Sequence, residues 1–239
     1  MNHYLSILVV AILSIGCKIT RPISNSDYGG NWGYRGELSE LEVLGVHANE
    51  EISEEDIQAA LKSKTTVNLK RGDRVVLVQS GAQFPDEPLL KGLSPYYSVI
   101  PISGVPAEDN RYRRSQNPEP RQPLDKTLRL AAAKAGAKTM IVYWGILDVG
   151  NEEHGTKIVS WVPVVGKIIP DEKQKMRIRL KAAVIDVATG AWQFHIPEVY
   201  EDTRTSARIN RKESDQGQVV RLKAKGYEAL VKDLLKHYN

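Results

Sequence analysis

Residues 175–184 decide the fold, and they read Lys175-Met176-Arg177-Ile178-Arg179-Leu180-Lys181-Ala182-Ala183-Val184. Basic and apolar residues alternate along this stretch. Successive side chains of a β-strand point to opposite faces, so the alternation predicts a strand with one face in the core and one in water. Residues 188–190 (Ala-Thr-Gly) then predict a turn, and Trp192, Phe194 and Ile196 continue the alternation on a returning strand. The sequence therefore predicts a β-hairpin.

Apolar stretches upstream predict further strands of the same sheet. Residues 138–149 form the longest one, which we expect at the centre of the sheet, and residues 74–80 are apolar on both faces, as in a sheet covered on both sides. Residues 98–103 contain Pro101, which lacks a ladder donor and favours an edge strand. The triplet Arg71-Gly72-Asp73 matches an adhesion motif in its letters, and a turn within residues 70–73 is sufficient to explain it.

Three helices are predicted from apolar spacing and capping residues. Ser53 with Asp56 resembles a capping box, and Ile52 with Ile57 occupies the positions of a hydrophobic staple, so a helix should cover residues 54–63. Gly136 should end a second helix over residues 124–135, and residues 213–238 should form the last. The side chains expected in the core are Ile57, Ala60 and Leu61 on the first helix, Leu124, Leu128, Ala131 and Ala135 on the second, and Val220, Ala224, Tyr227, Val231 and Leu234 on the third.

Together these elements predict a single α/β (α+β) domain over residues 41–239, with one mixed sheet, a β-meander and packed helices. Residues 124–203 contain a helix ending in Ala-Gly-Ala, a buried strand and a meander closed by residues 186–190 (Asp-Val-Ala-Thr-Gly). This order resembles the small periplasmic module of TolB-type proteins and of CsgG-type curli-secretion lipoproteins. The resemblance implies a lipoprotein that binds other envelope proteins and has no chemistry of its own.

The amino-terminal residues differ from the rest of the chain. Residues 1–16 contain no Asp, Glu, Lys or Arg, and their apolar run of about 12 residues has the length of a signal-peptide core and is too short to span a bilayer. Cys17, the only cysteine, follows Gly16 directly. A lone thiol cannot form an internal disulfide. After Gly16 no stretch approaches the length of a membrane span.

Residues 13–17 (Leu-Ser-Ile-Gly-Cys) resemble the lipobox of bacterial lipoproteins, with Ser14 at the position where an aliphatic residue is usual. The resemblance implies that residues 1–16 are a cleaved signal peptide and that Cys17 carries fatty acyl chains such as palmitate, which anchor the protein to a membrane of the cell envelope. Lys18 stands where an aspartate would retain the protein at the inner membrane, so the outer membrane and its periplasmic face are favoured. An ordinary cleaved signal, or a buried helix, is the alternative. Residues 17–40 are rich in Gly, Ser and Asn and should form a flexible tether, although the aromatic residues Tyr28, Trp32 and Tyr34 could instead dock on the body or on a partner.

Composition and charge exclude several classes of protein. The 239 residues are 41% hydrophobic and 26% charged, which is typical of a folded protein. The formal net charge is +4, and residues 204–239 contain nine Lys or Arg against four Asp or Glu. This basic terminal helix could face anionic head groups, lipopolysaccharide or an acidic partner, although a solvated helix face is the simpler explanation. No nucleic-acid recognition motif accompanies the charge, so we expect no nucleic-acid partner.

The sequence offers one polar cluster that could hold a metal ion: Asp148, Glu152, Glu153 and His154. The residue types suit zinc or calcium, but no second histidine lies at a ligand-like spacing and the composition also fits a solvated hairpin loop. His47, His195 and His237 are isolated in sequence. Ser80 and Ser103 end apolar strands but do not sit on the strained turn that a nucleophilic serine requires. We therefore assign no catalytic residue, metal ligand or cofactor.

Two functions remain. The first is a lipid-anchored binding or assembly module with an envelope protein as its partner and no catalysis of its own. The second is a lipid-anchored hydrolase, a peptidase or an enzyme acting on cell-wall material, which would use the acidic loop at His154 with or without a metal. Residues 161–170, from Trp161 to Pro170, are apolar except for Lys167 and form either a buried connection or an exposed contact surface.

Overall fold

The computed structural model describes residues 21–25, 34–47, 50–63, 66–106, 122–152, 159–160, 173–205 and 211–238. The predicted signal peptide, Cys17, Glu153, His154 and residues 161–170 lie outside these ranges. The strands are β1 (Arg21–Pro22), β2 (Arg74–Ser80), β3 (Ser98–Gly104), β4 (Thr139–Glu152), β5 (Val159–Ser160), β6 (Lys173–Asp186), β7 (Trp192–His195) and β8 (Tyr200–Thr205). The helices are the 3-10 turn η1 (Ile23–Asn25), α1 (Glu40–Val43), α2 (Glu54–Lys62), α3 (Glu87–Leu93), α4 (Leu124–Lys134) and α5 (Arg211–Tyr238).

All the described strands belong to one mixed sheet, with the main order β3-β2-β4-β6-β7. Strands β3, β2 and β4 are parallel to one another, whereas β4, β6 and β7 form an antiparallel meander. The predictions of a mixed α/β sheet, of a meander, of a central strand β4 and of an edge strand carrying Pro101 are confirmed. Strand β8 pairs with β6 beyond β7, while β1 and β5 pair with the far half of β4.

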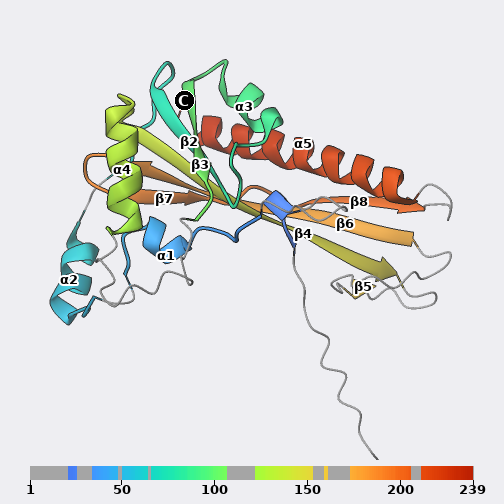
Figure 1. The fold of residues 1–239 in the computed structure, drawn as a ribbon, viewed down its shortest axis with the longest axis horizontal. Coiled ribbons are helices and arrows are strands. Elements are labelled where there is room, and N and C mark those ends of the chain that lie inside the picture. Colours follow the sequence, from blue (N-terminus) through green and yellow to red (C-terminus); the bar gives the residue numbers. More distant parts are fainter. Residues whose placement is uncertain are drawn as a thin grey trace, which may run out of the picture.

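Helices cover both faces of the sheet, which creates two cores. On one face α3 and α5 pack against β-strand residues such as Ile141 and Ile178, and α5 runs along the length of the sheet (Figure 1). On the other face α4 packs against residues such as Val76 and Val142. Strand β2 is buried on both faces, as its sequence predicts.

Helix α3 is the one element of the parallel half that the sequence analysis does not predict. It is only seven residues long and contains Pro88 and Gly92, which hide its apolar spacing. Leu89 and Leu93 are nevertheless fully buried. The helix connects β2 to the parallel strand β3, as such a pair requires.

Strand β6 follows its predicted alternation only in its first half. Ile178 and Leu180 pack against Gly226 of α5, while Arg177 and Arg179 lie on the opposite face. Farther along, Ala183 is buried under α4 as well. On the returning strand β7 the prediction is wrong in detail, because Trp192 and, beyond the strand's end, Ile196 are exposed and His195 is the buried residue.

The apolar stripe of α5 is displaced by one position at its start. Val219 and Leu222 are buried, whereas Val220 and Ala224, which the sequence places in the core, are exposed. Tyr227, Val231 and Leu234 are buried as predicted. Two adjacent valines satisfy the spacing equally well, so the sequence alone does not choose between them.

Candidate functional site

The acidic loop provides one described carboxylate, and arginines occupy it. Asp148 Oδ2 lies 2.8 Å from Nε of Arg177 and 2.9 Å from Nε of Arg179, which face it from β6. Glu153 and His154 lie outside the described residues. Among the residues that the structure describes, no group of three His, Cys, Asp or Glu could hold a metal ion. A cation at Asp148 would have to displace two guanidinium groups.

The two serines at strand ends accept hydrogen bonds from backbone N–H groups. Ser80 is completely buried, and its Oγ accepts a hydrogen bond of 2.8 Å from the N–H of Leu38. Ser103 is exposed, and its Oγ accepts a hydrogen bond of 3.3 Å from the N–H of Val105. Both hydroxyl oxygens thus accept hydrogen bonds from backbone N–H groups, which explains a structural role for each serine.

The carboxyl ends of parallel strands are where open α/β sheets usually bind ligands. In this protein the chain's own amino-terminal segment lies there. Ser24 Oγ lies 2.9 Å from the carbonyl oxygen of Ser80 and is also hydrogen-bonded to Glu37 Oε1. The hydroxyl of Tyr34 donates a hydrogen bond of 3.3 Å to the same oxygen of Glu37. Burial, reinforced by the charge of Glu37, raises the pKa of Tyr34 to about 12.

The prediction that residues 17–40 form a flexible tether is therefore wrong for the parts that are described. Ile23 and Leu38 are buried, one in each core, and β1 pairs with β4. The indole N–H of Trp144 donates a hydrogen bond of 3.0 Å to the carbonyl oxygen of Leu38. The described residues 21–25 and 34–40 consequently belong to the folded body, whose expected start is Leu41.

A buried polar network joins α3 and α5 to the sheet. Gln79 Oε1 accepts hydrogen bonds from the hydroxyl of Tyr143 over 2.6 Å and from the N–H of Asp86 over 2.7 Å. Asp86 Oδ2 accepts a hydrogen bond from the hydroxyl of Tyr227 and lies 3.0 Å from Nζ of Lys223. Burial raises the pKa of both tyrosines well above 10, so both hydroxyls stay neutral and serve as donors. The network therefore connects α5 to the sheet, which is a structural role.

The isolated histidines also find partners. His195 Nδ1 lies 2.9 Å from Asp233 Oδ2, and its Nε2 lies 3.2 Å from the hydroxyl of Tyr238. The ring of His237 packs edge-on against that of His195. These contacts fasten the carboxyl end of α5 to β7.

His47 has a separate role. Its Nε2 lies 3.0 Å from Oδ1 of the buried Asp125, in the first turn of α4. The contact holds the chain between α1 and α2 against α4. After it, the chain leaves the body to form α2 and returns at the buried Leu69.

Helix α2 carries an apolar surface that the body does not cover. Its capping box is present as predicted, with Ser53 and Asp56 bonded reciprocally. The predicted burial is wrong: α2 has no buried residue, and Ile52, Ile57 and Leu61 are 58%, 44% and 73% exposed. We call these three residues the α2 surface. The spacing of Ile57 and Leu61 gives a helix an apolar face, but it does not say what that face meets.

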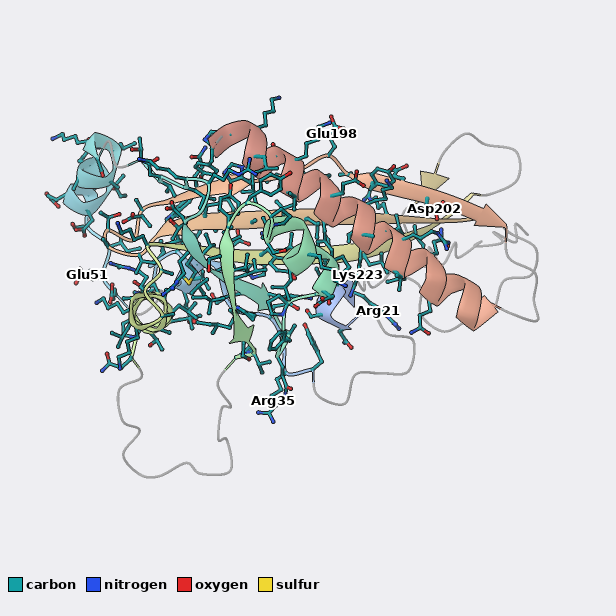
Figure 2. All side chains as sticks on the ribbon, turned by 90° about the horizontal axis from the view of Figure 1, so that it is seen from above. Arg21, Arg35, Glu51, Glu198, Asp202 and Lys223 are labelled. Carbon is teal, nitrogen blue, oxygen red and sulfur yellow. The ribbon has the colours of Figure 1, made fainter. Side chains whose placement is uncertain are left out.

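Acidic residues surround the α2 surface. Glu50, Glu51, Glu54 and Glu55 are all exposed. Glu51 lies at one end of the molecule, far from Arg21 and from Asp202 at the other end (Figure 2). An apolar face with an acidic rim at one end of the molecule has the composition of a protein-binding surface.

Comparison with solved structures gives distant likenesses. The PelC dodecamer from Paraburkholderia phytofirmans is 17% identical, with 70% of this chain and 94% of that chain covered and a TM-score of 0.28. The hypothetical protein CT253 from Chlamydia trachomatis is 9% identical, with 66% and 98% covered and a TM-score of 0.30. Lipoprotein GNA1162 from Neisseria meningitidis is 13% identical, with 64% and 99% covered and a TM-score of 0.24. We draw nothing from likenesses at these scores, and the resemblance to TolB-type and CsgG-type modules stays a prediction.

No curated protein matches the chain. No helix in the described ranges has both the length and the apolar character needed to cross a bilayer. A family model, that of the YafT bacterial lipoprotein, matches residues 39–237, which include almost the whole folded body. The chain therefore belongs to the YafT bacterial lipoprotein family.

Proposed function

We propose that this lipoprotein is a binding or assembly module of the cell envelope, which engages another envelope protein through the α2 surface and carries out no catalysis. The observation that carries the proposal is the exposure of Ile57 and Leu61 on a capped helix outside both cores. Burying an aliphatic side chain is worth about 1.5–3 kcal/mol. Two such anchors on one helix face are a common basis of helix-in-groove recognition.

The setting of α2 favours binding further. A helix of nine residues is marginal in water by itself, and the reciprocal hydrogen bonds of the capping box between Ser53 and Asp56 stabilise its first turn. A partner would therefore meet a helix whose start is already fixed, which lowers the cost of ordering it on binding.

Charge indicates the chemistry of the partner. The glutamates around α2 would be repelled by anionic lipid head groups and attracted by basic side chains. We therefore expect a protein with an apolar groove and a basic rim, and not the membrane surface.

The proposed function places the membrane anchor at Cys17. Cleavage after Gly16 and acylation of the cysteine would hold the body at a membrane, because two or three acyl chains give effectively permanent attachment. Lys18 in place of aspartate supports the outer membrane, and the periplasmic face follows from export. The membership in a lipoprotein family supports this anchor.

Site-specific photo-cross-linking in intact cells tests the partner. A photoreactive amino acid at Leu61 should give a discrete protein adduct, while the same group at Val220, which is also exposed and lies on α5, should give none. Adding Ile57→Lys to the Leu61 probe should abolish the adduct, because it places a cation against a basic rim and keeps helix propensity. Val220→Lys is the matched control and should leave the adduct intact. Adducts to lipid alone, or equal yields at the two positions, would contradict the proposal.

A further inference from the structure

Strand β1 fixes where the acylated end of the chain meets the body. Arg21 and Pro22 pair with Leu147 and Ile146 of β4 in antiparallel register. The next residue, Ile23, is buried against Leu180, and Ser24 is bonded to the end of β2. Residues 21–24 are thus fastened to the sheet.

The length of chain between Cys17 and this attachment is short. Only Lys18, Ile19 and Thr20 intervene. Consecutive Cα atoms are 3.80 Å apart, so the Cα atoms of Cys17 and Arg21 are separated by at most about 15 Å. A flexible spacer over residues 17–40 would instead have an average span of about 25–30 Å and a far longer reach.

The two residues of β1 point to opposite faces of the sheet, because Arg21 pairs with Leu147, which lies in the core under α5, and Pro22 pairs with Ile146. Residues paired across strands point to the same face, so Pro22, Ile146 and Arg179 form one row across β1, β4 and β6. The neighbouring residues of β6, Ile178 and Leu180, point the other way and pack against α5. We call Pro22, Ile146 and Arg179 the β1 row.

We propose that β1 holds the body beside the bilayer, so that the end of the sheet at β1 lies next to the lipid head groups and the turn after β6 lies away from them. The proposal rests on acylation of Cys17, which is part of the proposed function. The neighbour of β1 is then the membrane that carries the anchor, because the chain gives the body no room to move away from it.

Tether length, and not charge, sets this arrangement. Arg177 and Arg179 already share Asp148, and Lys181 is paired with Glu40. On the sheet face of the β1 row, these three basic side chains are therefore already paired with carboxylates and offer little free charge to anionic lipid. The orientation should accordingly be insensitive to salt, which would weaken an electrostatic contact strongly.

The arrangement leaves the α2 surface accessible. Helix α2 and β1 are well separated in both views of the molecule (Figures 1 and 2). A body held at β1 would keep α2 away from the anchoring point, where a partner protein can reach it.

Energy transfer to the membrane surface tests the orientation. Cys17 is the only cysteine and its thiol is consumed by acylation, so a cysteine introduced elsewhere is the only free thiol. Acylated protein carrying Arg21→Cys or Ala188→Cys is labelled with a donor dye in phosphatidylethanolamine–phosphatidylglycerol vesicles that contain a head-group acceptor dye. Ala188 lies in the turn after β6, and Asp186 at the end of that strand is about 23 Å from Arg179 at 3.3 Å per residue.

Transfer at position 21 should exceed transfer at position 188 at least about twofold, and the ratio should not change when salt is raised. Inserting twelve Gly and Ser residues between Thr20 and Arg21 lengthens the tether without touching β1, and should bring the two positions to the same low value. Equal transfer at the two positions in the uninserted protein would overturn the orientation while leaving the anchor intact. Failure of the protein to float with the vesicles would overturn the anchor, and the orientation with it.

Discussion

The backbone N–H of Leu38 donates a hydrogen bond of 2.8 Å to the hydroxyl oxygen of Ser80, which lies completely buried at the end of β2. This bond joins the amino-terminal segment to the centre of the sheet. It also explains why a polar residue ends an otherwise apolar strand. The segment that looks like a spacer in the sequence is held by contacts of this kind.

Replacing this hydroxyl should destabilise the protein. Ser80→Ala leaves the buried N–H of Leu38 without its partner, which should lower the free energy of unfolding by about 1–3 kcal/mol in a urea titration. Ser103→Ala is the matched control, because Ser103 is exposed, and it should change the value by less than about 0.5 kcal/mol. Equal effects of the two substitutions would show that Ser80 does not hold the segment.

Gly145 should be intolerant of a side chain. A Cβ atom there would lie 2.5 Å from Cδ2 of Leu180 and 2.7 Å from Cδ1 of Ile23, so Gly145→Ala should push Ile23 off the sheet and cost about 1–3 kcal/mol. At Gly217 in α5 the nearest atom to a new Cβ is Arg221 Nη1 at 3.6 Å, and Gly217→Ala should stabilise the helix by up to about 1 kcal/mol. Thermal unfolding of both variants checks the sign of each change. A Gly145→Ala protein as stable as the parent would mean that Ile23 is not seated as described.

Stability should fall at alkaline pH. Burial raises the pKa of Tyr143 and of Tyr227 above the ordinary value of 10.0 in the folded protein. A group whose pKa is raised on folding contributes stability that is present below the unfolded pKa and is lost as the pH rises through the folded one. The free energy of unfolding should therefore decline above about pH 10. The double variant Tyr143→Phe with Tyr227→Phe should show a shallower decline, and an unchanged slope would contradict the assignment.

The α2 surface should be dispensable for folding. Ile57→Lys and Leu61→Lys replace exposed side chains and retain helix propensity, so each should alter the free energy of unfolding by less than about 0.5 kcal/mol. Leu230→Ala, at a fully buried position of α5, should cost about 2–5 kcal/mol in the same urea titration. A loss above about 1 kcal/mol at Ile57 or Leu61 would show that α2 packs on the body.

Much of the fold could be predicted from the sequence because its strands and long helices have clear periods. The alternation around Ile178 and the apolar run of β2 specify strands, and the capping residues Ser53 and Asp56 mark the start of α2. Period and capping are local properties of the chain, so they are visible without the partner of each element. Helix α3 could not be recognised in the sequence, because it is only seven residues long and contains Pro88.

The placement of the candidate sites could not be predicted in the same way. The spacing of Ile57 and Leu61 predicts an apolar helix face, but it does not identify what that face packs against. In the structure the rest of the protein does not cover these two side chains. Strand β1 has only two residues, and the composition around it is that of a linker, so the burial of Ile23 has no sequence signal. The partnership of Asp148 with Arg177 and Arg179 depends on a register between two strands that lie about thirty residues apart.

Intact-mass spectrometry of the protein isolated from its native membrane tests the anchor on which both proposals rest. The account predicts a chain that starts at Cys17 and carries the added mass of a diacylglyceryl group and an amide-linked acyl chain. A mass that includes residues 1–16, or that leaves the thiol of Cys17 unmodified, would contradict it.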